Sequence, residues 1–207
     1  LFGALASSVV FDYFVRQKIG AITLNFFYVK QFPVVKPSDL SDHRYFIIPR
    51  FLELTYPSWD IKAFADDIWR EADEPLRAVI RQQWEQNKAE TGGHTWEIPD
   101  WADAYPEIDW NPERGGCCPL PPFRWHEERR ALLRAELDAL YALLYGLTDE
   151  DLRYILDPQD VCGPDFPGET FRVLKDKEER QFGEYRTKRL VLEAWERLKN
   201  QSPESNG

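Results

Sequence analysis

The chain has 207 residues, enough for one domain of ordinary size or two small ones, and 43% of them are hydrophobic. It contains no run of about eighteen apolar residues, which excludes a membrane-spanning helix. Its three cysteines are an odd number and two of them, Cys117 and Cys118, are adjacent. This pattern argues against a disulfide framework and predicts a reducing, cytoplasmic compartment.

The net charge of −10 argues against a nucleic-acid binder, but the charges are unevenly distributed. Residues 1–50 carry six Lys/Arg and three Asp/Glu, residues 51–128 carry seven and seventeen, and residues 129–207 carry thirteen and sixteen. Within the last block, residues 172–189 hold seven basic and four acidic side chains. Two modestly basic stretches therefore flank an acidic middle, and this balance is compatible with a DNA-facing surface.

The first elements expected along the chain are a helix and a short extended run. Over residues 3–17, apolar and small side chains recur at three- and four-residue steps, the period of a helix that Gly20 would end. We expect a short strand at 21–24, a turn of helix through 25–31 and extended chain into Pro33 and Pro37. Residues 45–56 fit either a strand or a helix.

Two helices and a long irregular segment should follow. Ser58 has the character of an N-cap, and the apolar spacing after it predicts an amphipathic helix with a buried face formed by Ile61, Phe64, Ala65, Ile68 and Trp69. A second helix is expected at 74–89. Residues 94–123 contain six prolines and three tryptophans, which predicts a functional loop or spacer whose tryptophans pack against other parts of the protein.

The last third of the chain is expected to be helical. A leucine stripe after Arg124 predicts a helix of about 22 residues that stops at Gly146. Thr148 and Asp151 resemble a capping box for a short helix that ends at Pro158. Residues 158–170 should form a loop, and a final helix should cover 184–199.

These patterns predict a mainly α protein with a small β component, an α+β class. We divide the chain into four ranges. Residues 1–57 form a connector helix with a short strand region, and residues 58–123 form helices with an acidic Trp/Pro-rich insert at 85–122. Residues 124–200 form a helical C-terminal region, and residues 201–207 form a disordered tail.

The sequence lacks a recognisable catalytic motif. It has no Gly-rich phosphate or dinucleotide loop after a strand and no G-x-S-x-G motif. The spacings of its three histidines and three cysteines fit no zinc pattern. Asp165, Glu169 and Lys175 suggest a metal-dependent nuclease, but Val173 stands where a second carboxylate would precede the lysine. We therefore expect no catalytic or metal site in this chain.

Two basic groups are candidates for phosphate contacts. In the first, the basic residues Arg16, Lys18, Lys30 and Lys36 are interleaved with Phe26, Phe27 and Tyr28. This mixture suits a phosphate backbone with occasional base contact, and the alternative is a core strand with lysines at its rim. The second group consists of Arg172, Lys175, Lys177, Arg180, Arg186, Lys188 and Arg189. Its alternative is a solvated helix face with pairs such as Glu184–Lys188. On the residues alone, the structural alternative is favoured in both groups.

Two stretches resemble a known family. "SSVVFDYFVRQKIGAITLNFFYVKQFPVV", at 7–35, is similar to the segment just beyond the catalytic domain of large adenine-specific DNA methyltransferases. These are single-chain restriction–modification enzymes of type IIG and their relatives in phage defence. "PFRWHEERRALLRAELDALYALLYGLTDEDLRYILD" and "GEYRTKRLVLEAWERL" resemble the C-terminal end of the same proteins.

The resemblance implies that this chain is the C-terminal, target-recognition and helical portion of a longer methyltransferase. The family's S-adenosylmethionine pocket and N-P-P-aromatic motif would lie upstream, so no cofactor is expected in this chain. Residues 1–57 would belong to the DNA-recognition domain. The implied DNA-binding residues are Arg16, Lys18, Asn25, Lys30, Gln31, Lys36, Arg186, Lys188 and Arg189.

The partners implied are double-stranded DNA, the upstream methyltransferase domain and other subunits of a defence system. DNA would be held while an adenine is flipped into the upstream pocket. An alternative is a protein–protein interaction scaffold that docks through the acidic middle and the leucine-striped helix without touching DNA. A free-standing nuclease is the third and weakest alternative.

Overall fold

The computed structural model describes residues 1–19, 24–111, 116–168 and 170–201. Over these residues the protein is mainly helical and contains no strand, so the helical class is confirmed and the small β component is not supported. The expected strand at 21–24 lies outside the described residues except for Leu24, which is in irregular chain. No helix within the described residues is long and apolar enough to cross a membrane.

The chain forms two compact units. Unit 1 consists of residues 1–41 and 134–207, and unit 2 consists of residues 42–133. Helices α4 (Pro37–Asp42) and α8 (Glu127–Leu144) each carry residues of both units. The functional ranges expected from the sequence, 1–57, 58–123 and 124–200, stay predictions.

Unit 1 begins with three short helices, α1 (Phe2–Ala6), α2 (Val9–Lys18) and α3 (Phe26–Val29). The single helix expected at 3–17 is wrong in one respect. It is interrupted at Ser7 and Ser8, which separate α1 from α2. The Ser8 hydroxyl accepts a hydrogen bond from the Phe11 N–H at 3.2 Å and thereby caps α2. The turn of helix expected within 25–31 is confirmed as α3.

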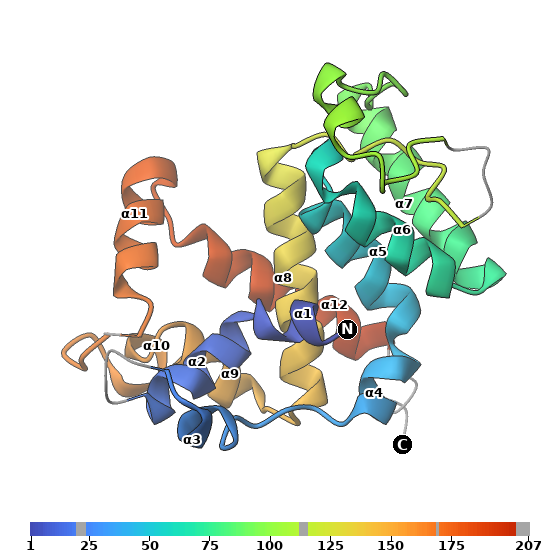
Figure 1. Ribbon diagram of the computed structural model, residues 1–207. Coiled ribbons are helices and arrows are strands. Elements are labelled where there is room, and N and C mark those ends of the chain that lie inside the picture. The colour runs from blue at the N-terminus through green and yellow to red at the C-terminus, as the bar shows by residue number, and fades with distance from the viewer. Residues whose placement is uncertain (20–23, 112–115, 169, 202–207) are drawn as a thin grey trace. The chain divides into compact units, whose positions relative to one another are not determined.

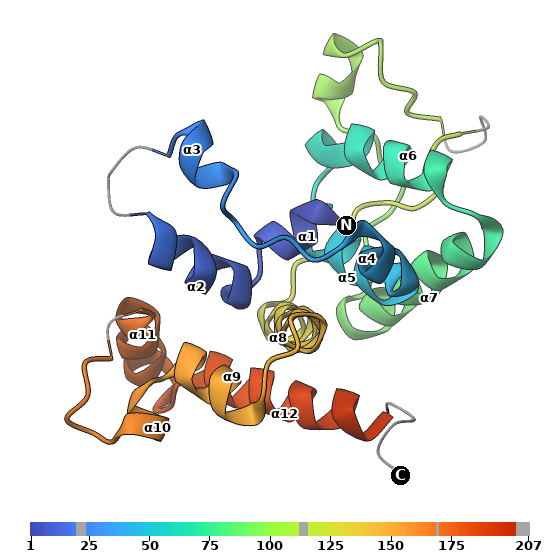
Figure 2. The same ribbon diagram turned by 90° about the horizontal axis from the view of Figure 1, so that it is seen from below.

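The remainder of unit 1 contains the second half of α8 and helices α9 (Asp149–Leu156), α10 (Gln159–Cys162), α11 (Arg172–Phe182) and α12 (Arg186–Gln201). The capping box of Thr148 and Asp151 is confirmed. Helix α10 lies in the expected 158–170 loop, and α11 was not expected. Helix α2 packs on α9, and α11 packs on α12 (Figures 1 and 2). The unit's most buried large side chains are Leu5, Val10, Tyr141, Leu152, Val191 and Trp195.

Unit 2 is built on α5 (Arg44–Thr55), α6 (Lys62–Glu71) and α7 (Glu74–Thr91), with 3₁₀ turns η1 (Trp59–Ile61) and η2 (Asp100–Ala104). Residues 45–56 are resolved as helix: their core-facing side chains recur at three- and four-residue steps. Helix α5 packs against α7 (Figure 1). The core cluster includes Leu52, Tyr56, Trp69, Ile80, Trp84 and Phe123.

A buried carboxylate joins three helices of unit 2. Glu53 on α5 is 1% exposed and accepts hydrogen bonds from Gln83 and Asn87 on α7 and from Arg129 on α8. The Arg129 contact is 2.6 Å from Nε to Oε1, and Arg129 also pairs with Glu90 at 2.8 Å. The cost of burying the Glu53 charge is therefore offset by an ion pair and by two amide donors.

The same network anchors the irregular 94–123 segment at its end. The Asn87 side chain donates to the Arg124 carbonyl at 2.9 Å and accepts from the Arg124 N–H at 3.0 Å. Trp84 Nε1 donates to the Pro121 carbonyl at 2.9 Å, and Trp96 Nε1 donates to that of Pro119 at 3.1 Å. The expectation that tryptophans of the segment pack against other parts of the protein is confirmed for Trp96, whose ring centre lies 4.8 Å from that of Trp59 on η1.

A second buried carboxylate lies in unit 1. Asp138 on α8 is 5% exposed and accepts a hydrogen bond from the Val9 N–H at the start of α2, at 2.8 Å. Burial raises the pKa of Asp138 to about 7, and the Val9 N–H and the charge of Arg134 only partly oppose this shift. Folding of unit 1 therefore favours the protonated acid.

Glu53→Ala should lower the free energy of unfolding by about 3–5 kcal/mol, because it leaves Arg129 and two amides in a buried site with their main acceptor removed. Urea unfolding followed by tryptophan fluorescence measures this change. Glu85→Ala is the control, since Glu85 is on the same helix as Asn87 and its side chain is 64% exposed. The control should cost less than about 0.5 kcal/mol. Equal losses in the two variants would contradict the assigned role of Glu53.

Asp138→Asn should stabilise the protein at about pH 8 and change little at about pH 3, below the ordinary pKa of an aspartate. The folded pKa of Asp138 lies above its ordinary value of 3.8, so the folded state binds the proton more tightly than the unfolded state. Stability of the natural chain should therefore fall by up to about 1.4 kcal/mol per pH unit as pH rises toward 7. Urea midpoints across this range measure the effect, with the exposed Glu179→Gln as control. An unchanged pH slope in Asp138→Asn would contradict it.

Candidate nucleic-acid interface

The first basic group lies on α2, α3 and the chain that follows them in unit 1. All six of its predicted DNA-binding residues are exposed: Arg16, Lys18, Asn25, Lys30, Gln31 and Lys36. Two contacts hold the chain after α3 against the unit. The rings of Phe32 and Phe11 pack edge to face at 5.8 Å, and the Tyr145 hydroxyl donates to the Pro33 carbonyl at 2.7 Å.

Two of these residues build α3. The Asn25 side chain accepts hydrogen bonds from the N–H groups of Phe27 and Tyr28, at 3.1 and 3.3 Å, and so caps the helix. Gln31 Nε2 donates to the Phe27 carbonyl at 3.1 Å at the other end. The geometry thus gives Asn25 and Gln31 a structural role in positioning the aromatic residues between them.

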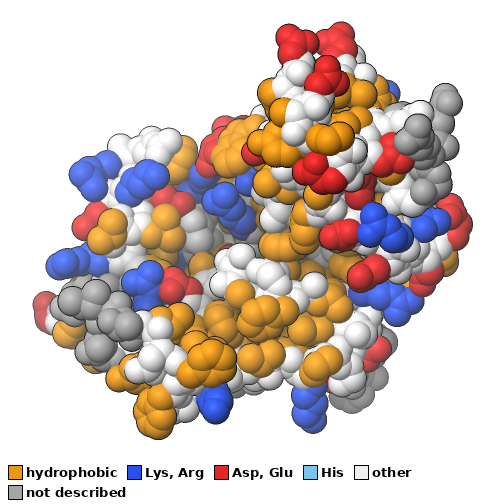
Figure 3. All heavy atoms as spheres, in the orientation of Figure 1, with side chains coloured by type: hydrophobic (Ala, Val, Ile, Leu, Met, Phe, Trp, Pro, Cys, Tyr) orange, Lys and Arg blue, Asp and Glu red, His pale blue; other side chains and the backbone are white. Residues whose placement is uncertain are grey.

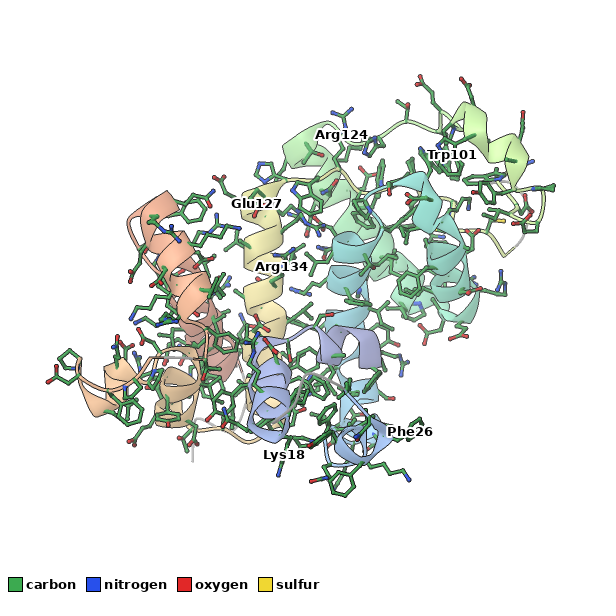
Figure 4. All side chains as sticks on the ribbon, turned by 60° about the vertical axis from the view of Figure 1, so that its left-hand side comes forward. Lys18, Phe26, Trp101, Arg124, Glu127 and Arg134 are labelled. Atoms are coloured by element: carbon green, nitrogen blue, oxygen red, sulfur yellow. The ribbon has the colours of Figure 1, made fainter. Side chains whose placement is uncertain are left out.

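The aromatic residues of α3 face solvent. Phe26 is 79% exposed and Phe27 is 71% exposed, which contradicts the alternative of a core strand with buried aromatics. Figure 3 shows hydrophobic side chains gathered over the region of α2 and α3, with basic side chains among them. In Figure 4, the labelled Lys18 and Phe26 point away from their helices. We call Lys18, Phe26, Phe27, Lys30 and Lys36 the basic–aromatic surface.

The charge of this surface is uncompensated in sequence and in contacts. Residues 13–38 contain four Lys/Arg and no Asp/Glu. Among the described residues, the ammonium groups of Lys18, Lys30 and Lys36 form no ion pair with a carboxylate, and Lys30 Nζ lies 5.9 Å from the centre of the Phe26 ring. Arg16 differs, because its Nε pairs with Asp12 at 3.0 Å. Lysines beside exposed rings can contact phosphates and bases together.

Two lysines of the second basic group, Lys175 and Lys188, are held by carboxylates of unit 1. Lys188 Nζ contacts Asp157 at 3.1 Å and Asp160 at 2.9 Å, and Lys175 Nζ contacts Asp157 at 2.8 Å. Asp157 is 4% exposed; burial would raise its pKa, but the hydrogen bonds from the two lysines hold that pKa below its ordinary value. The same bonds raise the pKa of Lys188 against the opposing effect of burial.

Two arginines of this group, Arg186 and Arg189, are also engaged. Arg189 pairs with Glu184 at 2.9 Å and with Glu193 at 3.0 Å, which raises its pKa. The Arg186 guanidinium lies 3.9 Å from the centre of the Phe182 ring. The salt-bridge alternative therefore matches the geometry of Lys188 and Arg189, but the expected pair Glu184–Lys188 is wrong, because Glu184 pairs with Arg189 and Lys188 pairs with Asp157 and Asp160. A phosphate role for the two residues stays a prediction.

Within the described ranges, no three His, Cys, Asp or Glu side chains are grouped to hold a metal ion. Lys175, considered for a nuclease site, is bound to Asp157, and Glu169 lies outside the described residues. Cys118 is fully buried, and burial raises the pKa of its thiol to about 11, so the reactive thiolate is disfavoured.

Comparisons of this chain with protein-family models, curated proteins and solved structures find no match. Its own geometry must therefore carry any functional conclusion.

Sequence reasoning missed the role of Asp157 and the exposure of the α3 aromatics. Asp157 lies between a short helix and a proline, where an acidic residue is usually solvated. A signal for the second feature was available, because "LNFFYVK" lacks the alternation of a half-buried strand and places Asn25 as a cap directly before Phe26.

Lys188→Ala should lower the free energy of unfolding by about 1–3 kcal/mol, because it removes one of two cations from the buried Asp157 carboxylate. Lys177→Ala is the matched control on α11, where the lysine is exposed. Urea unfolding near neutral pH distinguishes the two variants. If Lys188→Ala left unfolding unchanged but weakened DNA binding, Lys188 would contact phosphate instead of holding the fold.

Proposed function

We propose that this chain is the C-terminal DNA-recognition portion of a site-specific adenine-N6 DNA methyltransferase of a restriction–modification or phage-defence system. The single observation that carries the proposal is the basic–aromatic surface, in which two exposed phenylalanines accompany three lysines that form no ion pair with any carboxylate the structure describes. This surface lies in the 7–35 stretch that resembles the methyltransferase segment.

The chemistry of the surface fits duplex DNA. Lys18, Lys30 and Lys36 would contact phosphates, which supplies affinity without sequence preference and makes binding sensitive to salt. Phe26 and Phe27 would contact sugars or base faces beside the backbone. Asn25 and Gln31, whose side chains cap α3, would act by holding these rings in place.

Methyl transfer would take place outside these residues. The sequence lacks the N-P-P-aromatic motif and a cofactor loop, so S-adenosylmethionine and the flipped adenine would bind to the upstream methyltransferase domain. The residues of this chain would hold the duplex while the base leaves the stack. Other defence-system subunits remain candidate partners of the same protein.

Charge reversal of the three surface lysines should abolish most of the DNA affinity. For K18E/K30E/K36E, we expect duplex affinity to fall by at least about tenfold at low salt, and the slope of log affinity against log salt to fall by about three. Fluorescence anisotropy with a labelled duplex across a salt titration measures both quantities.

The matched control is R172E/K177E/R180E, which makes the same change in net charge at three exposed positions of α11. Because acidic Asp176, Glu178 and Glu179 are interleaved with these residues, the control should lose less than about threefold. Equal losses of DNA affinity in both triple variants would mean that the effect comes from net charge alone, and this would overturn the proposal. So would failure of the natural chain to bind duplex DNA at low salt.

A further inference from the structure

Tryptophans from two parts of unit 2 form one cluster. The ring of Trp59, on η1, lies 4.8 Å from Trp96 and 6.4 Å from Trp110, measured between ring centres. Trp101, on η2, lies 5.5 Å from Trp110 and 5.9 Å from the ring of Tyr105. This cluster is not buried in the hydrophobic core of unit 2, because Trp101 is 42% exposed and Tyr105 is 47% exposed.

A pocket opens between these rings. Its volume is about 400 Å³, and its walls include Trp59, Trp101, His94, Pro99 and Pro122, with the exposed carboxylate of Asp60 at its edge. A second pocket of about 650 Å³ includes Trp110, Glu107 and Ile108 in its lining. Since Trp110 packs against both Trp59 and Trp101, the two pockets share the aromatic cluster. We call the first the tryptophan pocket.

The surroundings of the tryptophan pocket are acidic. Residues 89–111 contain six Asp/Glu and no Lys/Arg. Figure 3 shows acidic side chains beside hydrophobic ones over this end of unit 2, and Figure 4 shows Trp101 near the end of the same segment. Burial and the nearby charge of Arg124 lower the pKa of His94, so the imidazole in the wall is neutral at pH 7. Arg124 is thus one cation near this wall, and Lys62 Nζ lies 5.5 Å from the centre of the Trp96 ring in the same cluster.

We infer that the tryptophan pocket binds an extended, cationic peptide segment of a partner protein, with an Arg or Lys side chain seated against Trp101 and Trp59. The faces of indole rings attract cations, and the carboxylates around the pocket add long-range attraction. Aromatic-lined grooves are a recurring site for extended peptides. Together the two pockets along this segment are larger than a single side chain, which favours an extended peptide over a single cationic group. The negative charge of the segment repels nucleic acid.

The pocket is rigid enough to act as a preformed site. Trp96 Nε1 is hydrogen-bonded to the Pro119 carbonyl at 3.1 Å, and Trp110 Nε1 to the Tyr105 carbonyl at 3.4 Å. The Asp66 carboxylate accepts from the Cys118 N–H at 2.7 Å and is paired with the fully buried Lys62. Little ordering would be required on binding, which favours affinity.

Isothermal titration of the 207-residue chain with a short peptide of alternating proline and arginine tests this inference. Trp101→Ala and Asp60→Asn should each weaken binding by about three- to tenfold, and replacing arginine with glutamine in the peptide should abolish it. Trp125→Ala is the matched control: Trp125 is 56% exposed in the same unit but does not line the pocket. Asp67→Asn is the control for the lost charge, since Asp67 is exposed on α6.

Both control variants should bind within about twofold of the natural chain, and melting temperatures of all four variants show whether each is folded. Binding of the glutamine peptide as tightly as the arginine peptide would overturn the inference. Equal losses in Trp101→Ala and Trp125→Ala would also overturn it, as would binding of free arginine amide as tightly as the peptide. None of these outcomes involves the lysines of unit 1, so the proposed DNA binding is tested separately.

Discussion

The ion pair of Glu53 and Arg129 is the interaction on which unit 2 depends. A carboxylate that is 1% exposed is costly to bury, and it is retained here because two helices, α7 and α8, direct donors at it. The same network also reaches the backbone of the long irregular segment, whose N–H and C=O groups have no neighbouring strand among the described residues with which to pair. Asn87 illustrates the connection, since it donates to Glu53 and exchanges two hydrogen bonds with the backbone of Arg124.

This arrangement explains how a segment rich in proline can present ordered aromatic rings. Buried backbone groups must be hydrogen-bonded, and helix side chains supply the partners that regular structure would otherwise provide. With Cys118, Pro121 and Arg124 fixed in this way, the tryptophans are constrained on one side by hydrogen bonds and on the other by ring contacts. The faces of the tryptophan rings that stay exposed are a consequence of this anchoring and not of too small a hydrophobic core.

The sequence predicted the positions of helices well, but it did not predict which charged side chains form ion pairs. The 3.6-residue period identified α6, α7 and α8, and the capping box fixed the start of α9. It did not separate α1 from α2, because serine hydroxyl capping competes with an otherwise unbroken apolar pattern. It also did not reveal which lysines are paired: Lys188 meets Asp157 and Asp160, about thirty positions away in the chain, whereas Lys18 has no acidic neighbour over residues 13–38.

The two basic groups differ more clearly in whether their charged side chains are paired than in how many acidic and basic residues they contain. Lys188 and Arg189 belong to a basic stretch, yet their side chains are occupied by carboxylates, and a phosphate would have to displace those contacts. The lysines of the basic–aromatic surface face no such competition. Around the tryptophan pocket the sign is reversed: Asp60 is part of its lining, and residues 89–111 contain six Asp/Glu and no Lys/Arg.

Salt should therefore affect the two surfaces differently. Lysine–phosphate contacts act through exposed charges and weaken strongly with ionic strength. A cation seated between indole rings retains part of its interaction, because the rings exclude water from one side and their attraction acts at short range. If both proposals hold, opposite charge and this difference in range would make nucleic acid the better ligand for α3 and a cationic peptide the better ligand for the tryptophan pocket.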